Sequence, residues 1–285
     1  MREGRPSFTA EAVAAARAVA RVDPVAPSMV QGALSLMARV GSTGGAGAAA
    51  VNVATFGLVD HIELRTRAID DAVRAGIDAG AAQLVILGAG LDARAWRMPE
   101  LAGAVVFEVD HPSTQAYKRA RIGARAPAAR DVRFVAVDFS RDALGDALAR
   151  AGHETAARTF WIWEGVTPYL PRDAMRATLA AIGARSARES RVAVTYGTPR
   201  GSKLGAAAVR VALLGFRALG EPIVGLVARD AMHAELADVG FRVLDDVAPD
   251  EWKVRFGGRR RRLLVVDERL VVAVSDGPPR ASRAA

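Results

Sequence analysis

The chain has 285 residues, of which 51% are hydrophobic and 25% are charged, and this composition excludes an intrinsically disordered protein. It contains no cysteine, which excludes disulfides, zinc ribbons, iron–sulfur clusters and cysteine nucleophiles. The net charge of +8 comes almost entirely from arginines spread along the sequence. The one dense cluster, Arg259–Arg262, is interpreted as a solvated hairpin loop or an anion-binding patch. Because no basic patch is interleaved with aromatic residues, a nucleic-acid partner is not expected.

The first 80 residues are predicted to form helices. One helix begins with Thr9 as its N-cap and ends at Asp23-Pro24, and a second helical run covers residues 64–80. Between them, Gly41–Gly47 is a glycine-rich break that is either a flexible joint or a backbone that approaches a ligand. We expect residues 1–80 to form a helical lid over the rest of the chain.

From residue 81 onward, short apolar runs alternate with helical patterns. Strands are predicted over residues 83–87, 104–109, 133–137, 159–163 and 191–196, and helices over residues 112–123, 141–151 and 171–187. Strands that are apolar along their whole length are buried on both faces. This pattern therefore predicts a parallel sheet with helices on each side.

The carboxyl-terminal part predicts a change of strand direction. A helix over residues 229–239 is followed by strand candidates over 241–246, 261–268 and 269–275. The last two candidates lie too close together for an intervening helix, so antiparallel pairing is required there. Residues 81–276 are thus predicted to form one α/β domain, with a mostly parallel seven-stranded sheet and an antiparallel carboxyl-terminal hairpin. An apolar helical insert covers about 200–228, and residues 277–285 form a flexible tail.

Small and acidic residues follow the first four predicted strands. Gly88 and Gly90 follow the first strand, Asp110 the second, Asp138-Phe139 the third and Glu164 the fourth. In a doubly wound sheet, ligands bind at the carboxyl ends of the strands. Glycines let a backbone approach a ligand, and a carboxylate can accept both hydroxyls of a ribose. The alternatives are helix N-caps for the two aspartates and an exposed turn for the glutamate.

Together these residues suit a ligand with a ribose, an adenine and a positive centre, and S-adenosylmethionine has all three. The run from Gly88 to Ala93 also reads G-x-G-x-x-A, the dinucleotide fingerprint, so an NAD-dependent oxidoreductase is the alternative. A dinucleotide needs a long helix whose N-terminus faces the pyrophosphate. Pro99 interrupts the segment after the glycines, which favours S-adenosylmethionine.

Four motifs carry a family resemblance: VILGAGLDARAWRM, FEVDHP, VAVDF and IWEGVTPYL, in this order. They resemble the leucine carboxyl methyltransferase family of class I S-adenosylmethionine-dependent methyltransferases. The sequence is most similar to the bacterial branch that includes polyketide O-methyltransferases. The resemblance implies a Rossmann-like fold, S-adenosylmethionine as cofactor and O-methyl transfer to a small molecule in secondary metabolism.

The resemblance also implies roles for individual residues. It implies that Arg65 or Arg67 contacts the carboxylate of the cofactor's methionine and that Glu164 lies near its amine, with Gly88 and Gly90 under the methionine portion. It further implies that Asp110 binds the ribose and that Asp138 and Phe139 contact the adenine. Eukaryotic members carry an arginine for the substrate carboxylate where this chain has Ser140, and Arg141 comes one residue later. A protein carboxyl-terminal leucine is therefore not the expected substrate.

The acceptor determines which catalytic groups are needed. A carboxylate needs no base, and Arg141 or Arg200 is the candidate to bind it. A hydroxyl needs a general base, and the candidates are His61, His111, His153 and His233, with His111 best placed beside Asp110. Tyr196, at the end of the fifth strand, is a further candidate for the acceptor pocket, with a buried, hydrogen-bonded tyrosine as the alternative.

The remaining expectations concern partners and location. No stretch reads as a membrane span or a signal peptide, which favours a cytoplasmic protein without a membrane partner. No metal is expected. The apolar insert is a roof for the acceptor, a plain helical packing layer or a homodimer face. An RNA methyltransferase is the less favoured alternative function, since only the abundance of arginine points to it.

Overall fold

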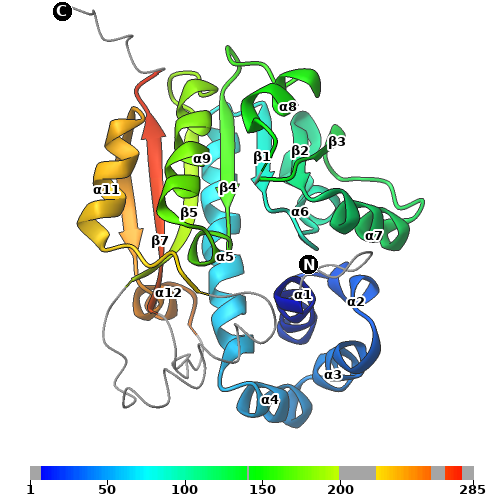
Figure 1. Ribbon diagram of the computed structural model, residues 1–285. Coiled ribbons are helices and arrows are strands. Elements are labelled where there is room, and N and C mark those ends of the chain that lie inside the picture. Colours follow the sequence, from blue (N-terminus) through cyan, green and yellow to red (C-terminus); the bar gives the residue numbers. More distant parts are fainter. Residues whose placement is uncertain (1–7, 140, 199–222, 258–266, 278–285) are drawn as a thin grey trace, which may run out of the picture.

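The computed structural model describes residues 8–139, 141–198, 223–257 and 267–277 (Figure 1). Seven strands form one mixed sheet in the order β3-β2-β1-β4-β5-β7-β6. Several sequence predictions fall outside the described residues: Ser140, Arg200, most of the apolar insert, Arg259–Arg262 and all but the first residue of the carboxyl-terminal tail. No helix of the described part is both long and apolar enough to cross a membrane.

The strands agree closely with the sequence prediction. They are β1 (Gln83–Leu87), β2 (Val105–Asp110), β3 (Asp131–Ala136), β4 (Thr159–Trp163), β5 (Arg191–Thr198), β6 (Phe241–Val247) and β7 (Asp267–Ser275). The predicted bounds of β1 and β4 are confirmed to the residue, because both strands are apolar and fully buried along their length. β1 to β5 run parallel to one another, as predicted.

The antiparallel pairing is confirmed, but its partners differ from the prediction. β7 lies between β5 and β6 and runs antiparallel to both, so both of its edges are hydrogen-bonded. It begins at Asp267, within the candidate over 261–268, and continues through the candidate over 269–275. The two candidates therefore do not pair with each other in the described residues. A helix that we did not predict, α12, separates β6 from β7.

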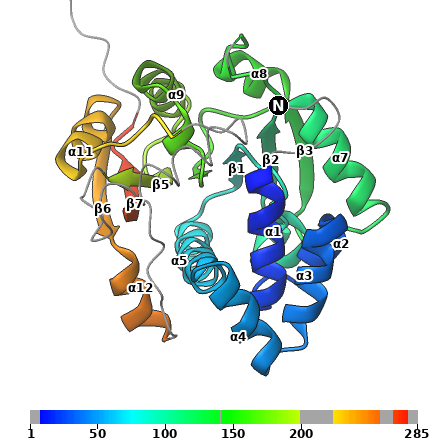
Figure 2. The same ribbon diagram turned by 60° about the horizontal axis from the view of Figure 1, so that its bottom comes forward.

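Helices cover both faces of the sheet and also the edge formed by the carboxyl ends of its parallel strands (Figures 1 and 2). They are α1 (Phe8–Ala20), α2 (Ala26–Met29), α3 (Gly32–Ser42), α4 (Gly45–Ala54), α5 (Leu58–Asp78), α6 (Arg94–Arg97), α7 (Pro112–Ile122), α8 (Leu144–Arg150), α9 (Arg172–Ala184), α11 (Arg229–Asp238) and α12 (Pro249–Phe256), with 3-10 turns η1 (Pro99–Gly103) and η2 (Thr167–Tyr169). The apolar sides of α8, α9 and α11 pack on one sheet face. Those of α5, α6 and α12 pack on the other.

The long helix α5 connects the amino-terminal helices to the sheet. Its Leu64, Ala68, Ile69 and Val73 recur at helical spacing and are buried against the strands. Helices α1 to α4 lie beyond the carboxyl ends of β1 and β4 and form their own small clusters (Figure 1). By packing, α5 belongs to the sheet layers, whereas α1 to α4 pack in clusters of their own, and their role as a lid stays a prediction.

The first helix differs at its start from the prediction. It already includes Phe8, so Thr9 lies in its first turn and is not the N-cap. In the turn between α1 and α2, the Asp23 carboxylate accepts hydrogen bonds from the N–H groups of Val25 and Ala26 at 2.9 and 3.1 Å. The glycine-rich break is present: α3 ends at Ser42, and Gly44 has a φ of 80° before α4 begins.

Gly76 provides a test of the packing between α5 and β4. A Cβ atom at this helical position would overlap the ring of buried Phe160. We expect Gly76→Ala to lower the free energy of unfolding by about 1–3 kcal/mol, measured by urea denaturation, because overpacking displaces the helix. Gly145→Ala in α8 is the control: its Cβ would meet only the Arg185 side chain at 3.8 Å, so no loss is expected there. Equal effects of the two substitutions would contradict the described packing.

Candidate functional site

The glycine turn after β1 is joined to the end of β2. Gly88 and Gly90 have φ angles of 65° and 47°, a region that favours glycine. A Cβ at Gly88 would also lie 2.5 Å from a methyl group of Val166. The carboxylate of Asp110 accepts hydrogen bonds from the N–H groups of Gly90 at 2.5 Å and of His111 at 2.6 Å. Burial raises the pKa of Asp110, and these two N–H groups act against that rise.

Asp138 and Phe139 follow β3 at the same edge of the sheet, next to the end of β2. The Asp138 side chain is 35% exposed, and Arg141 approaches it at 3.8 Å. Phe139 is partly buried against the main core cluster. A partly exposed carboxylate beside an anchored ring suits the recognition of a flat, amine-bearing base, as the sequence predicts for this pair.

Glu164 follows β4 and lies in a buried cluster of arginines. Its carboxylate accepts hydrogen bonds from Arg17 at 2.7 Å and from Arg65 and Arg94 at 2.9 Å. Burial would raise the pKa of Glu164, but Arg17, Arg94 and Arg65 hold it well below its usual range. The three arginines come from α1, α5 and α6, so this one carboxylate connects three helices to the end of β4. We call these four residues the Glu164 cluster.

A second carboxylate, Glu268 at the start of β7, extends the cluster. It accepts hydrogen bonds from the Arg65 guanidinium at 3.1 and 3.2 Å, and its Oε2 lies 2.5 Å from Nε2 of His61. Burial raises the pKa of Glu268, but Arg65 and His61 outweigh burial and bring it to about 2. Nδ1 of His61 is buried and has no hydrogen-bond partner among the described residues.

The sequence analysis did not single out Arg17, Arg94 or Glu268. Arg94 is fully buried and pairs with Asp92, with Glu164 and, at 2.7 Å, with Asp70. A signal was available, because Asp92, Arg94 and Arg97 are charged residues inside the otherwise apolar LDARAWRM run. Arg17 and Glu268 lie 147 and 203 residues from partners that no local pattern could reveal.

The sequence did not decide whether Arg65 or Arg67 contacts the methionine carboxylate, and the two side chains occupy different environments. Arg65 is buried and belongs to the Glu164 cluster. The Arg67 side chain is 47% exposed and pairs with Glu63 on the surface of α5. Arg65 is therefore the one that lies near the predicted cofactor edge. Arg141 is 83% exposed, and its described ion pair is with Asp138.

In two further catalytic candidates, His111 and Tyr196, side-chain polar atoms already have hydrogen-bond partners. Nδ1 of His111 lies 2.8 Å from Oγ of Ser113 and accepts from the Ser113 N–H, so the ring caps α7. Tyr196 is fully buried and donates its hydroxyl hydrogen to Asp246 at 2.7 Å. Burial, then Asp246, raise the pKa of this tyrosine above its ordinary value. This is the buried, bonded tyrosine that the sequence analysis gave as the alternative.

The other histidines are distributed over the molecule. His233 lies beside Asp246, 2.6 Å from its carboxylate. His153 contacts Thr159, the first residue of β4, at the opposite end of that strand from Glu164. Burial, with Arg185 nearby, lowers its pKa to about 4. Of the four candidates, His61 is the histidine bonded into the extended Glu164 cluster.

The edge of the sheet fits S-adenosylmethionine by the chemistry of its groups. Gly88 and Gly90 add no side chain of their own at this edge, where Val166 and Ala10 lie against them, and the Asp110 carboxylate is already fixed by two N–H groups. The Glu164 cluster offers both signs of charge, which a zwitterionic methionine group requires. In the described part of the chain, no group of three or more potential ligands is arranged to hold a metal ion.

Comparison with known proteins gives related sequences and one related fold. The chain is 42% identical over 138 residues to a Frankia alni protein provisionally named an S-adenosyl-L-methionine-dependent methyltransferase, covering 48% of each chain. It is 44% identical over 140 residues to a Mycobacterium bovis protein with the same provisional name, covering 48% of this chain and 45% of that one. The matched segment thus spans about half the length of these curated relatives.

The fold has a counterpart among solved structures, a DUF574 family protein from Streptomyces avermitilis. The TM-score is 0.64 at 14% identity, with 95% of this chain and 98% of that chain covered. A family model described as "Leucine carboxyl methyltransferase" matches residues 9–183, more than half of the chain. The resemblance noted in the sequence is therefore confirmed, and the chain belongs to the leucine carboxyl methyltransferase family.

Proposed function

We propose that this protein is an S-adenosylmethionine-dependent O-methyltransferase that acts on a hydroxyl or carboxylate of a small molecule, in secondary metabolism of the polyketide type. One observation carries the proposal: Gly88, Gly90, Asp110 and Glu164 meet at one edge of the sheet, and the family model covers all four. The relatives with provisional methyltransferase names support the same chemistry.

The cofactor site is proposed as follows. Asp110 holds the ribose hydroxyls, Asp138 and Phe139 hold the adenine, and Gly88 and Gly90 leave room for the methionine portion. Arg65 binds the methionine carboxylate and Glu164 binds the amine, with Arg17 and Arg94 keeping Glu164 ionised. When bound, the cofactor supplies a methyl group on a positively charged sulfur.

The chain's own contribution to the reaction is alignment and the exclusion of water. The buried Glu164 cluster fixes three helices around the proposed methionine end of the cofactor. For a carboxylate acceptor, Arg141 stays the candidate partner. For a hydroxyl acceptor, His61 can take the proton at its unpartnered Nδ1 while Glu268 orients the ring.

The NAD alternative is weakened by the local structure. After the glycine turn, α6 has only four residues, Arg94–Arg97, and is followed by the 3-10 turn η1. A helix of one turn provides little dipole for a pyrophosphate. Titration calorimetry separates the two functions, because we expect S-adenosylhomocysteine to bind and NAD not to bind. Methyl transfer from labelled S-adenosylmethionine to a panel of phenols and carboxylic acids then tests the acceptor class.

Asp110 gives the sharpest test of the cofactor site. We expect Asp110→Asn to weaken S-adenosylhomocysteine binding at least tenfold, measured by titration calorimetry, because hydrogen bonds to a charged group contribute about 1.5–3 kcal/mol. Asp131→Asn at the start of β3 is the matched control and should change the affinity less than twofold, since that exposed side chain pairs with Arg133. Unchanged affinity in Asp110→Asn would refute the assigned ribose site.

The lowered pKa of Glu268 predicts that the folded protein loses stability in acid. Its pKa of about 2 in the folded protein lies below its ordinary value of 4.5, so the unfolded state binds protons more readily. We expect the contribution of Glu268 to be fully present above about pH 4.5 and to disappear as the pH falls toward 2. Glu268→Gln should be less stable than the parent at pH 6, and its unfolding free energy should fall less steeply over that window. Parallel pH profiles from thermal denaturation would contradict the described pairing.

A further inference from the structure

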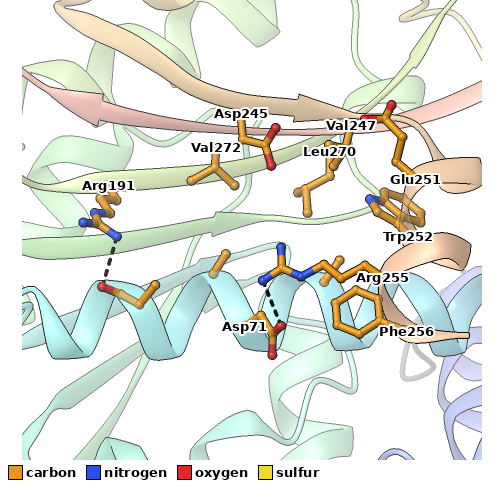
Figure 3. A pocket seen from close by; sticks show the side chains of 13 residues that line it. Asp71, Arg191, Asp245, Val247, Glu251, Trp252, Arg255, Phe256, Leu270 and Val272 are labelled. Carbon is orange, nitrogen blue, oxygen red and sulfur yellow. Dashed lines mark hydrogen bonds and ion pairs between the residues drawn. The ribbon is translucent and has the colours of Figure 1, made fainter.

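A separate cavity lies on the α5 face of the sheet, between α5, α12 and the strands β6 and β7 (Figure 3). Its volume is about 330 Å³, within the usual range of small-molecule sites. None of the residues proposed to hold S-adenosylmethionine lines this cavity. The family resemblance assigns no role to this cavity, so the class of ligand that it could bind is inferred from the residues that line it.

The walls are mostly apolar. Ala68, Ala72 and Ala75 of α5 face the cavity, and their small side chains keep the helix from filling the space beside the sheet. Leu270 and Val272 of β7 form the facing wall, as Figure 3 shows. Such a slot between a helix and a sheet excludes a strongly hydrated ligand and suits a flat, apolar one.

Two hydrogen-bond donors in this cavity lack partners. Trp252 is 2% exposed, and its indole N–H has no hydrogen-bond acceptor among the described residues. Figure 3 shows the nitrogen side of this ring turned toward Leu270 and the cavity. The Nε–H of Arg191 is buried and also has no acceptor, although another nitrogen of the same guanidinium donates to the Ala75 carbonyl at 3.0 Å. A buried donor without an acceptor is costly, so both positions favour a ligand that brings acceptors.

The cavity distinguishes Trp252 from the other unpartnered indoles. Trp161 and Trp163 also have no acceptor for their N–H groups, but both are fully buried in the core cluster on the opposite sheet face. They do not line the cavity. The orphaned N–H of Trp252 therefore belongs to a residue of the cavity wall, whereas those of Trp161 and Trp163 do not.

The charges around the cavity limit the ligand further. Arg255 forms an ion pair with Asp71 at 3.1 Å, which neutralises that part of the rim. The carboxylates of Asp245 and Glu251 are exposed and lie along the other side. These two carboxylates outnumber the one cation of the lining without a described carboxylate partner, Arg191, so an anion is disfavoured, while the orphaned donors favour acceptor atoms. An uncharged ligand with acceptor oxygens satisfies both conditions.

We propose that this cavity is a second binding site, for a flat, uncharged, apolar molecule that carries acceptor oxygens, such as a ketone, ester or lactone, with one oxygen accepting the indole N–H of Trp252. The site is independent of methyl transfer. It therefore remains testable whatever acceptor the cofactor edge takes.

The test uses the full-length protein and two probes that differ by a single carbonyl group, 1-indanone and indane. Ligand-observed NMR titration at millimolar concentration measures both affinities, with saturating S-adenosylhomocysteine present or absent. We expect saturable binding of 1-indanone. Trp252→Phe should weaken it about five- to tenfold, because it removes one hydrogen bond but keeps the ring, and should leave indane binding within twofold. Trp161→Phe is the matched control and should change neither affinity.

Two further measurements use a variant that fills the cavity and a probe that carries a negative charge. Ala72→Leu should abolish binding of both neutral probes, and indane-2-carboxylate should bind at least tenfold more weakly than 1-indanone. The proposal is overturned by a lack of saturable 1-indanone binding, by binding that survives Ala72→Leu, or by equal losses for both probes in Trp252→Phe. Displacement of 1-indanone by S-adenosylhomocysteine would also overturn it, because the probe would then occupy the cofactor edge. Failure of S-adenosylhomocysteine to bind, measured separately, would concern only the methyltransferase proposal.

Discussion

The pairing of Glu164 with Arg17, Arg65 and Arg94 is the interaction on which the arrangement of this molecule depends. It joins α1, α5 and α6 to the end of β4, and all four side chains are nearly inaccessible to water. Taking four charges out of water is expensive, and only close, well-directed hydrogen bonds offset that cost. The cluster therefore stabilises one relative position of these helices strongly and tolerates others poorly.

Loss of one member of such a cluster has a larger effect than its net contribution to stability suggests. The remaining charges stay buried without a partner, and breaking buried pairs in this way costs about 3–5 kcal/mol. Glu268 makes β7 dependent on the same charges, because it links Arg65 and His61 to this strand at the far side of β5. The amino-terminal helices and the last strand thus depend on the same group of charges.

The sequence was sufficient to predict the parts of the fold that depend on local patterns. The bounds of β1 and β4 could be predicted because these buried strands are apolar after their first residue. The glycines and acids could be located because they lie at the ends of strands or directly after them. Helix α12 was missed although Pro249 at its first turn and Asp250 and Glu251 behind it are typical start signals. It is only eight residues long and lies in a stretch that we interpreted through its strands.

The site itself was only half predictable. Asp110 ends a strand and Glu164 follows one, so both could be located, whereas Arg17 and Glu268 enter the site from opposite ends of the chain. Nothing in the local spacing of those residues indicates a partner more than 140 positions away. The orphaned indole of Trp252 was equally hidden, because only the packing of α12 over the sheet shows which atoms lack partners.

The position of β7 in the sheet has a consequence for how the chain reaches its native state. Because β7 inserts between β5 and β6, those two strands cannot complete their pairing until the last described strand has been synthesised. During translation the edge of β5 stays open, with its backbone N–H and carbonyl groups available to other extended chains. The sheet is therefore completed only when β7 pairs with both of its neighbours, and until then the chain carries an exposed strand edge.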